Sequence, residues 1–132
     1  YVLDCIDTVS AKLLLIRRCK KVDVPILCSM GAANKLDPTA FKVADIEKTA
    51  VDPLAKVIRI ECRKRRLGKV KVVFSEEQPL PPLEDEIKEA PTAARRTVPA
   101  SNAFVPAACG LVCGSEVVKD ILRKAGGYRG AK

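Results

Sequence analysis

Residues 1–30 read YVLDCIDTVSAKLLLIRRCKKVDVPILCSM, and their pattern indicates the fold class. Residues 1–6 and 24–30 are short apolar runs of the length and composition expected for buried strands. Between them, residues 9–21 place apolar side chains at helical intervals and gather lysine and arginine in the last turn, where cations favour a helix C-terminus. A strand–helix–strand unit pairs its strands in parallel through a crossover. The stretch therefore predicts an α/β fold.

The elements expected downstream extend this unit. Residues 41–46 alternate like a strand, and the apolar run VKVVF at residues 70–74 predicts another. A helix is expected from Asp52-Pro53 to Gly68, because aspartate is a favoured cap, proline a favoured first helical residue and glycine a common end. Residues 104–125 predict one long helix. Its inward side is expected to consist of Leu111, Ser115, Val118, Ile121 and Leu122.

Composition changes along the chain and divides it into four segments. Residues 1–75 carry most of the strands and helices, residues 102–125 the C-terminal helix, and residues 126–132 a short tail. In residues 76–101 no periodicity survives, acidic residues are frequent, and five of the nine prolines of the chain are found there. We interpret this segment as an acidic, proline-rich linker or crossover loop, with a mobile lid as the alternative.

Composition also excludes several classes of protein. The 132 residues are about one domain's worth, and their 24 basic and 16 acidic residues give a net charge of +8. No histidine is present, which excludes a Ser-His-Asp triad or an HExxH zinc site made by this chain. No apolar run in this chain approaches the about 20 residues that span a bilayer.

The six cysteines are expected to be reduced and structural. Cys5 and Cys28 fall within apolar runs, and free buried cysteine behaves as a small apolar residue. The CxxxC spacing of Cys109 and Cys113 differs from the CxxC of zinc or thioredoxin-like sites. Reduced thiols indicate a reducing compartment. We expect a cytoplasmic location and leave a mitochondrial one open, since a targeting segment would precede Tyr1.

The sharpest local signal lies at the carboxyl end of the first predicted strand. Asp7 ends the strand and Thr8 follows it at the start of the helix, with Lys12 one helical turn further on. Ligands of open parallel sheets bind beyond the carboxyl ends of the strands, where a carboxylate can hold a magnesium ion on a nucleotide phosphate. The alternative is that Asp7 or Thr8 only caps the helix, as both residue types often do.

Several motifs, found in order along the chain, resemble one known family. The segment DCIDTVSAK (residues 4–12) resembles the Asp-x-x-Asp-(Asn/Thr/Ser)-x-x-x-(Arg/Lys) segment of the ThiF/MoeB adenylating enzymes, which are related to ubiquitin-activating enzymes. Three further segments resemble one branch of this family, the tRNA threonylcarbamoyladenosine dehydratases. They are SMGAANKLDPTAFKVADIEKTAVDPLAKVIR (29–59), VVFSEE (72–77) and PASNAFVPAACGLVCGSEVV (99–118). The resemblance covers most of residues 1–125.

The resemblance implies the C-terminal half of a Rossmann-like ThiF-type fold: a mixed sheet with flanking helices and a long C-terminal helix. It implies ATP-dependent dehydration of threonylcarbamoyladenosine in tRNA, by ring closure through an acyl-adenylate, with ATP and Mg²⁺ as cofactors. Asp7 matches the aspartate of the family that contacts magnesium and ATP, Lys12 matches its basic residue, and Thr8 belongs to the same cofactor-binding motif. Metal and cation would stabilise the charge that gathers on the α-phosphate. A homodimer is common in the family and is expected here.

The chain also departs from the family. The glycine-rich loop near GxGGVGS, which cradles phosphate in the family, has no counterpart here. We therefore expect a fragment that lacks most of the ATP site, with a second chain supplying the missing half as the alternative.

Two other functions stay open. One is adenylation of a ubiquitin-like or sulfur-carrier protein C-terminus, for which zinc pairs and a partner-facing cysteine would be needed. The other is an inactive basic module that binds RNA or protein. Cys62 and Cys109 are poor thioester candidates, because each lies on an apolar helix face without a basic activator.

Basic residues concentrate between residues 56 and 71, and the densest part is Arg63, Lys64, Arg65 and Arg66. Phosphate backbones attract such patches without sequence preference, so these four residues are predicted to contact tRNA. A solvated helix face is the alternative. Aromatic residues are scarce in this region, so we expect contacts to the RNA backbone rather than to stacked bases.

Overall fold

The computed structural model describes residues 1–81 and 99–130. The strands in these residues are β1 (Val2–Asp4), β2 (Ile26–Ser29), β3 (Phe41–Asp45) and β4 (Lys71–Ser75). The helices are α1 (Val9–Lys21), α2 (Pro53–Lys64) and α4 (Val105–Lys124), with a short 3-10 helix at Ile46–Lys48. Each strand and helix predicted from the sequence is present, and the mixed α/β fold with a long C-terminal helix is confirmed. None of these helices combines the length and apolar character needed to cross a membrane.

The strands form one mixed sheet in the order β1-β2-β4-β3. β1, β2 and β4 run parallel, whereas β3 pairs with β4 in the antiparallel sense. Asp4, the last residue of β1, lies beside Cys28 of β2, and Ser29 of β2 lies beside Val73 of β4. The carboxyl ends of the three parallel strands therefore meet at one edge of the sheet.

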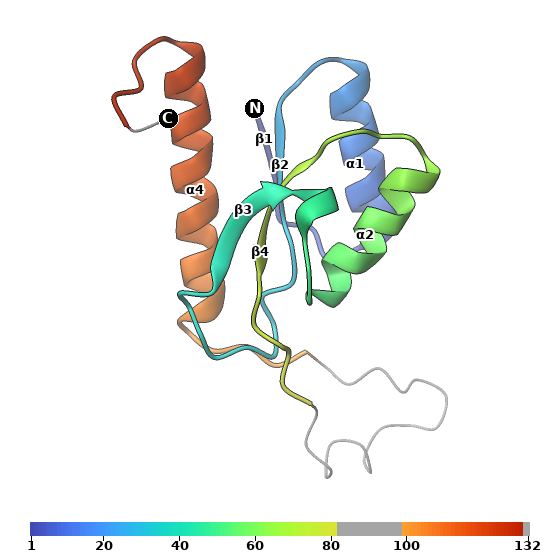
Figure 1. Ribbon diagram of the computed structural model, residues 1–132, viewed down its shortest axis with the longest axis vertical. Coiled ribbons are helices and arrows are strands. Elements are labelled where there is room, and N and C mark those ends of the chain that lie inside the picture. The colour runs from blue at the N-terminus through green and yellow to red at the C-terminus, as the bar shows by residue number, and fades with distance from the viewer. Residues whose placement is uncertain (82–98, 131–132) are drawn as a thin grey trace.

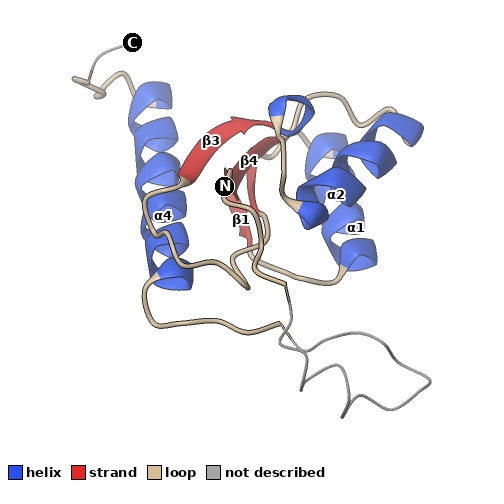
Figure 2. Cartoon of the chain, turned by 60° about the horizontal axis from the view of Figure 1, so that its bottom comes forward, coloured by secondary structure: helices blue, strands red, loops and turns tan. Residues whose placement is uncertain are grey.

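Helices cover both faces of the sheet. α1 and α2 lie together against one face, and α4 lies alone against the other (Figure 1, Figure 2). Ile16 of α1 and Ile58 of α2 are fully buried in the first layer. Leu27 and Val73 pack against Val105 of α4 in the second layer. Because β2 and β4 are buried on both faces, they read as continuous apolar runs.

α2 begins where its sequence predicts. Asp52 is the N-cap, and its Oδ1 accepts a hydrogen bond from the backbone N–H of Ala55 at 2.8 Å. Pro53 occupies the first helical position, where a missing N–H costs nothing. The helix ends at Lys64, earlier than the predicted end at Gly68. Gly68 lies in the turn that follows and adopts a φ of +68°, which glycine tolerates without strain.

The first strand is shorter and less covered than predicted. It ends at Asp4 rather than at residue 6, and Cys5 is exposed rather than buried. Leu3 is 42% exposed, although its partner in register, Leu27, is fully buried. α4 packs on β2, β3 and β4, so the corresponding side of β1 is left open.

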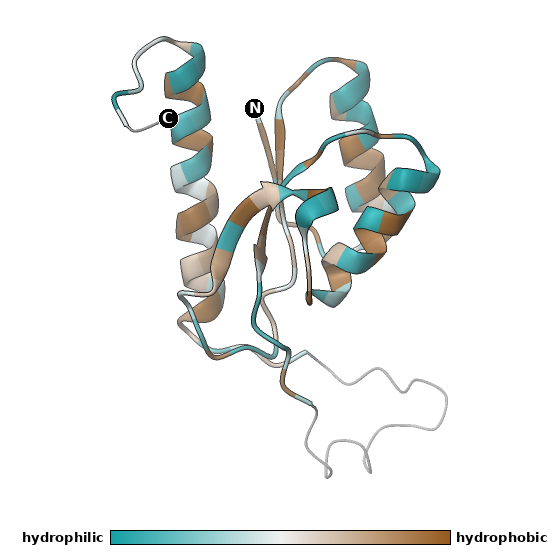
Figure 3. Ribbon diagram, viewed as in Figure 1, coloured by the Kyte–Doolittle hydropathy of each residue, from teal (hydrophilic) through white to brown (hydrophobic). Residues whose placement is uncertain are grey.

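The prediction of which side of α4 faces inward is wrong. Its five members, Leu111, Ser115, Val118, Ile121 and Leu122, are all exposed. The residues that α4 buries instead are Val105, Cys109, Cys113 and Glu116. Apolar residues recur along much of α4 (Figure 3), so hydropathy alone favours the wrong side.

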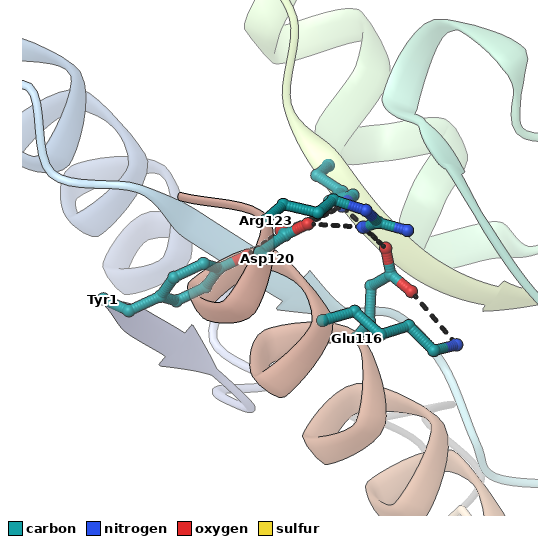
Figure 4. Close-up of polar contacts among 6 residues, drawn as sticks. Tyr1, Glu116, Asp120 and Arg123 are labelled. Atoms are coloured by element: carbon teal, nitrogen blue, oxygen red, sulfur yellow. Dashed lines mark hydrogen bonds and ion pairs between the residues drawn. The ribbon is translucent and has the colours of Figure 1, made fainter. Parts of the chain in front are cut away.

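A polar network explains why α4 turns Glu116 toward the sheet. The ammonium of Lys71, on β4, lies 2.8 Å from Glu116 Oε1 and 2.8 Å from Asp120 Oδ1. Arg123 bonds to the same two carboxylates, and the hydroxyl of Tyr1 donates to Asp120 at 2.7 Å (Figure 4). The network therefore ties α4 to β4 and to the first residue of the chain.

The predicted linker, residues 76–101, lies largely outside the described residues, which include 76–81 and 99–101 of it. Asn34 binds both described ends: its carbonyl accepts from the N–H of Leu80 at 2.7 Å, and its side-chain oxygen accepts from the N–H of Ala100 at 2.8 Å. Both ends are thus fixed beside the loop that follows β2.

Candidate functional site

A cavity of about 640 Å³ lies where the carboxyl ends of β1 and β2 meet the first turn of α2 and of α4. We call it the strand-end cavity. The charged and polar side chains in its wall are Asp7, Ser29, Asn34, Lys35, Asp52 and Ser101. Its position is the one where open parallel sheets bind ligands.

Asp7 lines this cavity, and its carboxylate makes no contact that stabilises the fold among the described residues. Its side chain is exposed, and no hydrogen bond or ion pair within the described chain involves it. Thr8 is the N-cap residue of α1, but its side chain makes no capping hydrogen bond. The alternative role predicted from the sequence, in which Asp7 or Thr8 only caps the helix through its side chain, is therefore wrong.

Lys12 lies behind the cavity wall rather than in it. Its Nζ is 2.5 Å from Asp4 Oδ2 and donates to the backbone oxygen of Ser29 at 2.9 Å. Both charged side chains are 0% exposed. Asp4 uses its other oxygen to accept the N–H of Ile6 at 2.9 Å. Lys12 thus joins the carboxyl ends of β1 and β2 and fixes the turn that leads to Asp7.

A second buried ion pair fixes the opposite wall. Lys35 Nζ lies 2.9 Å from Asp52 Oδ2 and 2.6 Å from the backbone oxygen of Gly31. The same aspartate caps α2, so one carboxylate holds both the loop after β2 and the helix. A Cβ atom on Gly31 would lie 3.1 Å from Asp52 Oδ2, so a larger residue would crowd this pair. Sequence patterns did not indicate Lys35, because the charge pair joins residues 17 positions apart.

Cys109 brings a thiol to the same cavity. Its Sγ lies 3.2 Å from Ser29 Oγ. The neighbouring thiol of Cys113, one helical turn on, is the largest cause that lowers the pKa of Cys109 below its ordinary value; Ser29 and the charge of Lys35 add to it, and burial opposes it. The sequence analysis missed this environment because Ser29 is 80 residues away along the chain.

The described residues contain no group of three side chains arranged to hold a metal ion. Asp7 and Asp52 are the carboxylates at the strand-end cavity, and Asp52 is already committed to Lys35 and to the cap of α2. Asp7 is therefore the carboxylate there that can turn to a ligand.

The predicted basic residues lie on and just after α2, and the structure gives most of them acidic neighbours. Arg63 Nε bonds to Glu47 at 2.7 Å, while Lys64 and Arg65 lie 3.0 and 3.1 Å from Glu61. The hydrogen bond to Glu47 raises the pKa of Arg63. The pKa of Glu61 is lowered by its hydrogen bonds to Lys64, which has the larger effect, and to Arg65. Arg66 has no acidic partner within the described residues.

One of the basic residues shares a surface groove with the candidate site. A groove of about 610 Å³ is lined by Arg65 and Glu61 from the end of α2 and by Asp7 and Thr8 from the start of α1. The structure thus brings Asp7, Thr8 and Arg65 to one surface, whereas Lys12 is enclosed.

Comparisons with known proteins agree with this fold. No protein-family profile matches the chain. Proteins named tRNA threonylcarbamoyladenosine dehydratase are 47% identical in Bacillus subtilis, over 93% of this chain and 51% of the relative, and 33% identical in Escherichia coli, over 95% and 53%. A protein named tRNA threonylcarbamoyladenosine dehydratase 2 from Saccharomyces cerevisiae is 40% identical over 65% of this chain and 21% of the relative.

Solved structures give the same result. The crystal structure of E. coli tRNA N6-threonylcarbamoyladenosine dehydratase, TcdA, in complex with AMP has a TM-score of 0.79 and 31% identity, covering 97% of this chain and 50% of that one. Its complex with ATP has a TM-score of 0.77. The chain spans about half the length of the relatives it matches. Over that half, it is a homologue of the tRNA threonylcarbamoyladenosine dehydratases and has the fold of TcdA, a ThiF-type protein.

Proposed function

We propose that the protein takes part in ATP-dependent dehydration of threonylcarbamoyladenosine in tRNA, by adenylation of its carboxylate and ring closure. The observation that carries the proposal is the uncommitted carboxylate of Asp7 at the strand-end cavity. The names of the relatives support the reaction, and structures of TcdA with AMP and ATP support the nucleotide.

The strand-end cavity fits a nucleotide in size and in chemistry. Ligand pockets measure about 300–1,000 Å³, and this cavity measures about 640 Å³. The neighbouring groove, which shares Asp7 with this cavity, is lined by the first turn of α1, where no side chain caps the helix and backbone N–H groups favour phosphate. Asp7 and Thr8 are the residues we assign to nucleotide contact.

Mg²⁺ also fits this donor set. Proteins commonly hold it through one or two carboxylates together with substrate phosphates, and Asp7 is a carboxylate placed for that. When bound, the ion would supply charge stabilisation at the phosphates.

We assign Lys12 a positioning role. Its ammonium is enclosed and paired with Asp4, so in this arrangement it does not reach a ligand in the cavity. By holding Asp4 and the backbone oxygen of Ser29, it sets the turn on which Asp7 stands.

Further phosphate-binding groups are needed for a complete ATP site. The sequence carries no GxGGVGS loop, and its relatives are about twice as long. We propose that these groups come from the remainder of a longer chain, or from a second chain.

The proposal includes tRNA as substrate and a homodimer as assembly. Arg63, Lys64, Arg65 and Arg66 form a basic patch beside the groove that leads to Asp7, which suits an RNA backbone. The exposed apolar residues of α4, Leu111 and Val118 among them, are 76% and 56% exposed and offer a surface for a second copy. The free thiols agree with a reducing compartment such as the cytoplasm.

The test is exchange of pyrophosphate into ATP by the full-length protein, measured with and without tRNA that carries threonylcarbamoyladenosine. Asp7→Asn keeps the shape of the side chain and removes its charge, and we expect it to abolish the tRNA-dependent exchange. Asp23→Asn, a change at an exposed aspartate beyond the other end of α1, is the matched control and should retain full exchange. Full exchange by Asp7→Asn would remove Asp7 from the mechanism.

A further inference from the structure

Asn34 lies in the loop after β2 and lines the strand-end cavity. Its backbone N–H donates to the carbonyl oxygen of Ala100 at 2.8 Å, and its own carbonyl accepts from the N–H of Leu80 at 2.7 Å. Its side-chain oxygen, Oδ1, accepts from the N–H of Ala100 at 2.8 Å. The backbone and the side-chain oxygen of Asn34 are therefore committed to two segments that are remote in the sequence.

The bond from Ala100 also fixes the orientation of the side-chain amide of Asn34. A backbone N–H can only donate, so the group that faces it is the amide oxygen and not the amide nitrogen. Nδ2 carries two N–H donors and makes no hydrogen bond within residues 1–81 and 99–130. Asn34 thus lines the cavity with its side-chain oxygen bonded and its donor group uncommitted.

The backbone around Asn34 is preorganised. Its φ is +57°, in the left-handed region that asparagine tolerates better than most residues. The next residue, Lys35, is held twice, because its side chain pairs with Asp52 and its carbonyl accepts from Asn102 Nδ2 at 3.0 Å. A donor on a loop fixed in this way loses little conformational freedom when it binds a ligand.

The other polar side chains that could donate in the cavity wall are less suited to a ligand. The ammonium of Lys35 is paired with Asp52. Ser29 Oγ is in contact with a thiol at 3.2 Å. Ser101 is exposed, and no hydrogen bond among the described residues holds its hydroxyl in place. Asn34 therefore offers an uncharged donor that is both uncommitted and fixed.

We propose that Asn34 is a ligand-binding residue of the strand-end cavity, and that its Nδ2 donates a hydrogen bond to an oxygen of the bound ligand. The inference rests on the proposed function, because it takes that oxygen to belong to the nucleotide or to the threonylcarbamoyl group. An amide N–H suits a phosphate, carbonyl or carboxylate oxygen and brings no charge of its own. Asp7, after β1, and Asn34, after β2, then contact the ligand from two neighbouring strand ends.

The test compares Asn34→Asp with Asn34→Gly in the full-length protein. Aspartate keeps an acceptor for Ala100 and tolerates a positive φ, but its carboxylate has no N–H to donate. Glycine keeps the backbone conformation and removes the whole side chain. We expect both variants to bind ligand at least about tenfold more weakly, and only Asn34→Gly to unfold at a lower temperature.

Two binding measurements distinguish the source of the oxygen. Titration with ATP alone reports on the nucleotide. Titration with tRNA that carries threonylcarbamoyladenosine, against the same tRNA without the modification, reports on the threonylcarbamoyl group. A loss confined to the first titration assigns the contact to the nucleotide, and a loss confined to the second assigns it to the threonylcarbamoyl group.

Ala33→Asp is the matched control, because it places a carboxylate in the same wall and removes no polar atom. Its effect on binding should be smaller than that of Asn34→Asp, and equal losses would overturn the proposal by showing that charge alone is responsible. Unchanged binding of both ligands by Asn34→Asp would also overturn it, and would leave Asn34 the structural role of joining Leu80 to Ala100. Pyrophosphate exchange by the unmodified protein tests the proposed function separately, because the binding titrations need no reaction.

Discussion

Lys12 Nζ lies 2.5 Å from Asp4 Oδ2, and neither side chain is exposed to solvent. Burying two charges costs several kcal/mol each, which the pair offsets only because further hydrogen bonds complete it. The backbone oxygen of Ser29 and the N–H of Ile6 provide those bonds. This charge pair therefore holds the strand end next to the candidate site, and removing the charge of either partner alone should destabilise the fold.

Lys12→Met should destabilise the protein by about 3–5 kcal/mol, because it leaves the Asp4 carboxylate buried without a counter-charge. Urea denaturation at pH 7 measures the effect. Lys21→Met, at an exposed lysine of the same helix, should change stability by less than about 0.5 kcal/mol. The double variant Asp4→Asn/Lys12→Met should recover part of the loss; a further loss in the double variant would contradict this account.

Substitutions of Asp52 should separate its two tasks. Asp52→Asn keeps a capping oxygen for Ala55 but leaves the buried Lys35 without its counter-ion, and Asp52→Ala removes both. Because a lost cap costs about 1 kcal/mol, the alanine variant should be less stable than the asparagine variant by about that amount. Thermal or denaturant unfolding of the two variants side by side tests this, and equal stabilities would show that the cap contributes nothing.

Much of the fold followed from local sequence patterns, and the errors have a common physical origin. Asp52-Pro53 fixed the start of α2, because a cap and a helical proline act within one turn. The prediction of the inward side of α4 failed because Glu116 forms an ion pair with Lys71, 45 positions away. This contact, rather than the hydropathy of the helix, decides which side of α4 faces the sheet. The same limit hid the environment of Cys109 beside Ser29 and the Lys35–Asp52 pair. Asp7 was visible because it lies between a strand and a helix that local sequence patterns indicate, three residues beyond the observed strand end.

The network around Lys71 should make stability depend on pH in the acid range. Burial is the largest single cause and raises the pKa of Glu116 and of Asp120, but the bonds from Lys71 and Arg123, with Tyr1 added at Asp120, together outweigh it, so each carboxyl ends with a lowered pKa. Their contribution is therefore present above the unfolded values of about 4 and is lost as pH falls through the lower folded values. Lys71→Met should cost about 1–3 kcal/mol at pH 7, and the gap to the unmodified protein should narrow below about pH 4. A gap that stays constant from pH 7 to pH 3 would contradict the assignment.

If the basic patch contacts tRNA, its charges should contribute to the salt dependence of tRNA binding. Replacing Arg63, Lys64, Arg65 and Arg66 with alanine in the full-length protein should weaken binding and flatten the plot of log affinity against log salt. Each lost phosphate contact lowers the slope by about 0.7–0.9. Arg17→Ala/Arg18→Ala, at two exposed arginines of α1, removes charge outside the patch and should leave the slope nearer the original value. An unchanged slope in the fourfold variant would exclude the patch from the RNA interface.

Glu61→Gln gives the opposite expectation within the same patch. Glu61 lies 3.0 Å from Lys64 and 3.1 Å from Arg65, and removing its charge frees both cations for phosphate. We expect tighter tRNA binding and a steeper salt slope than in the unmodified protein, because more counterions are released on binding. Glu76→Gln, at an exposed glutamate paired with Lys42 outside the patch, is the control and should leave the slope unchanged. Weaker binding by Glu61→Gln would mean that this carboxylate orders the two cations for RNA rather than competing with it.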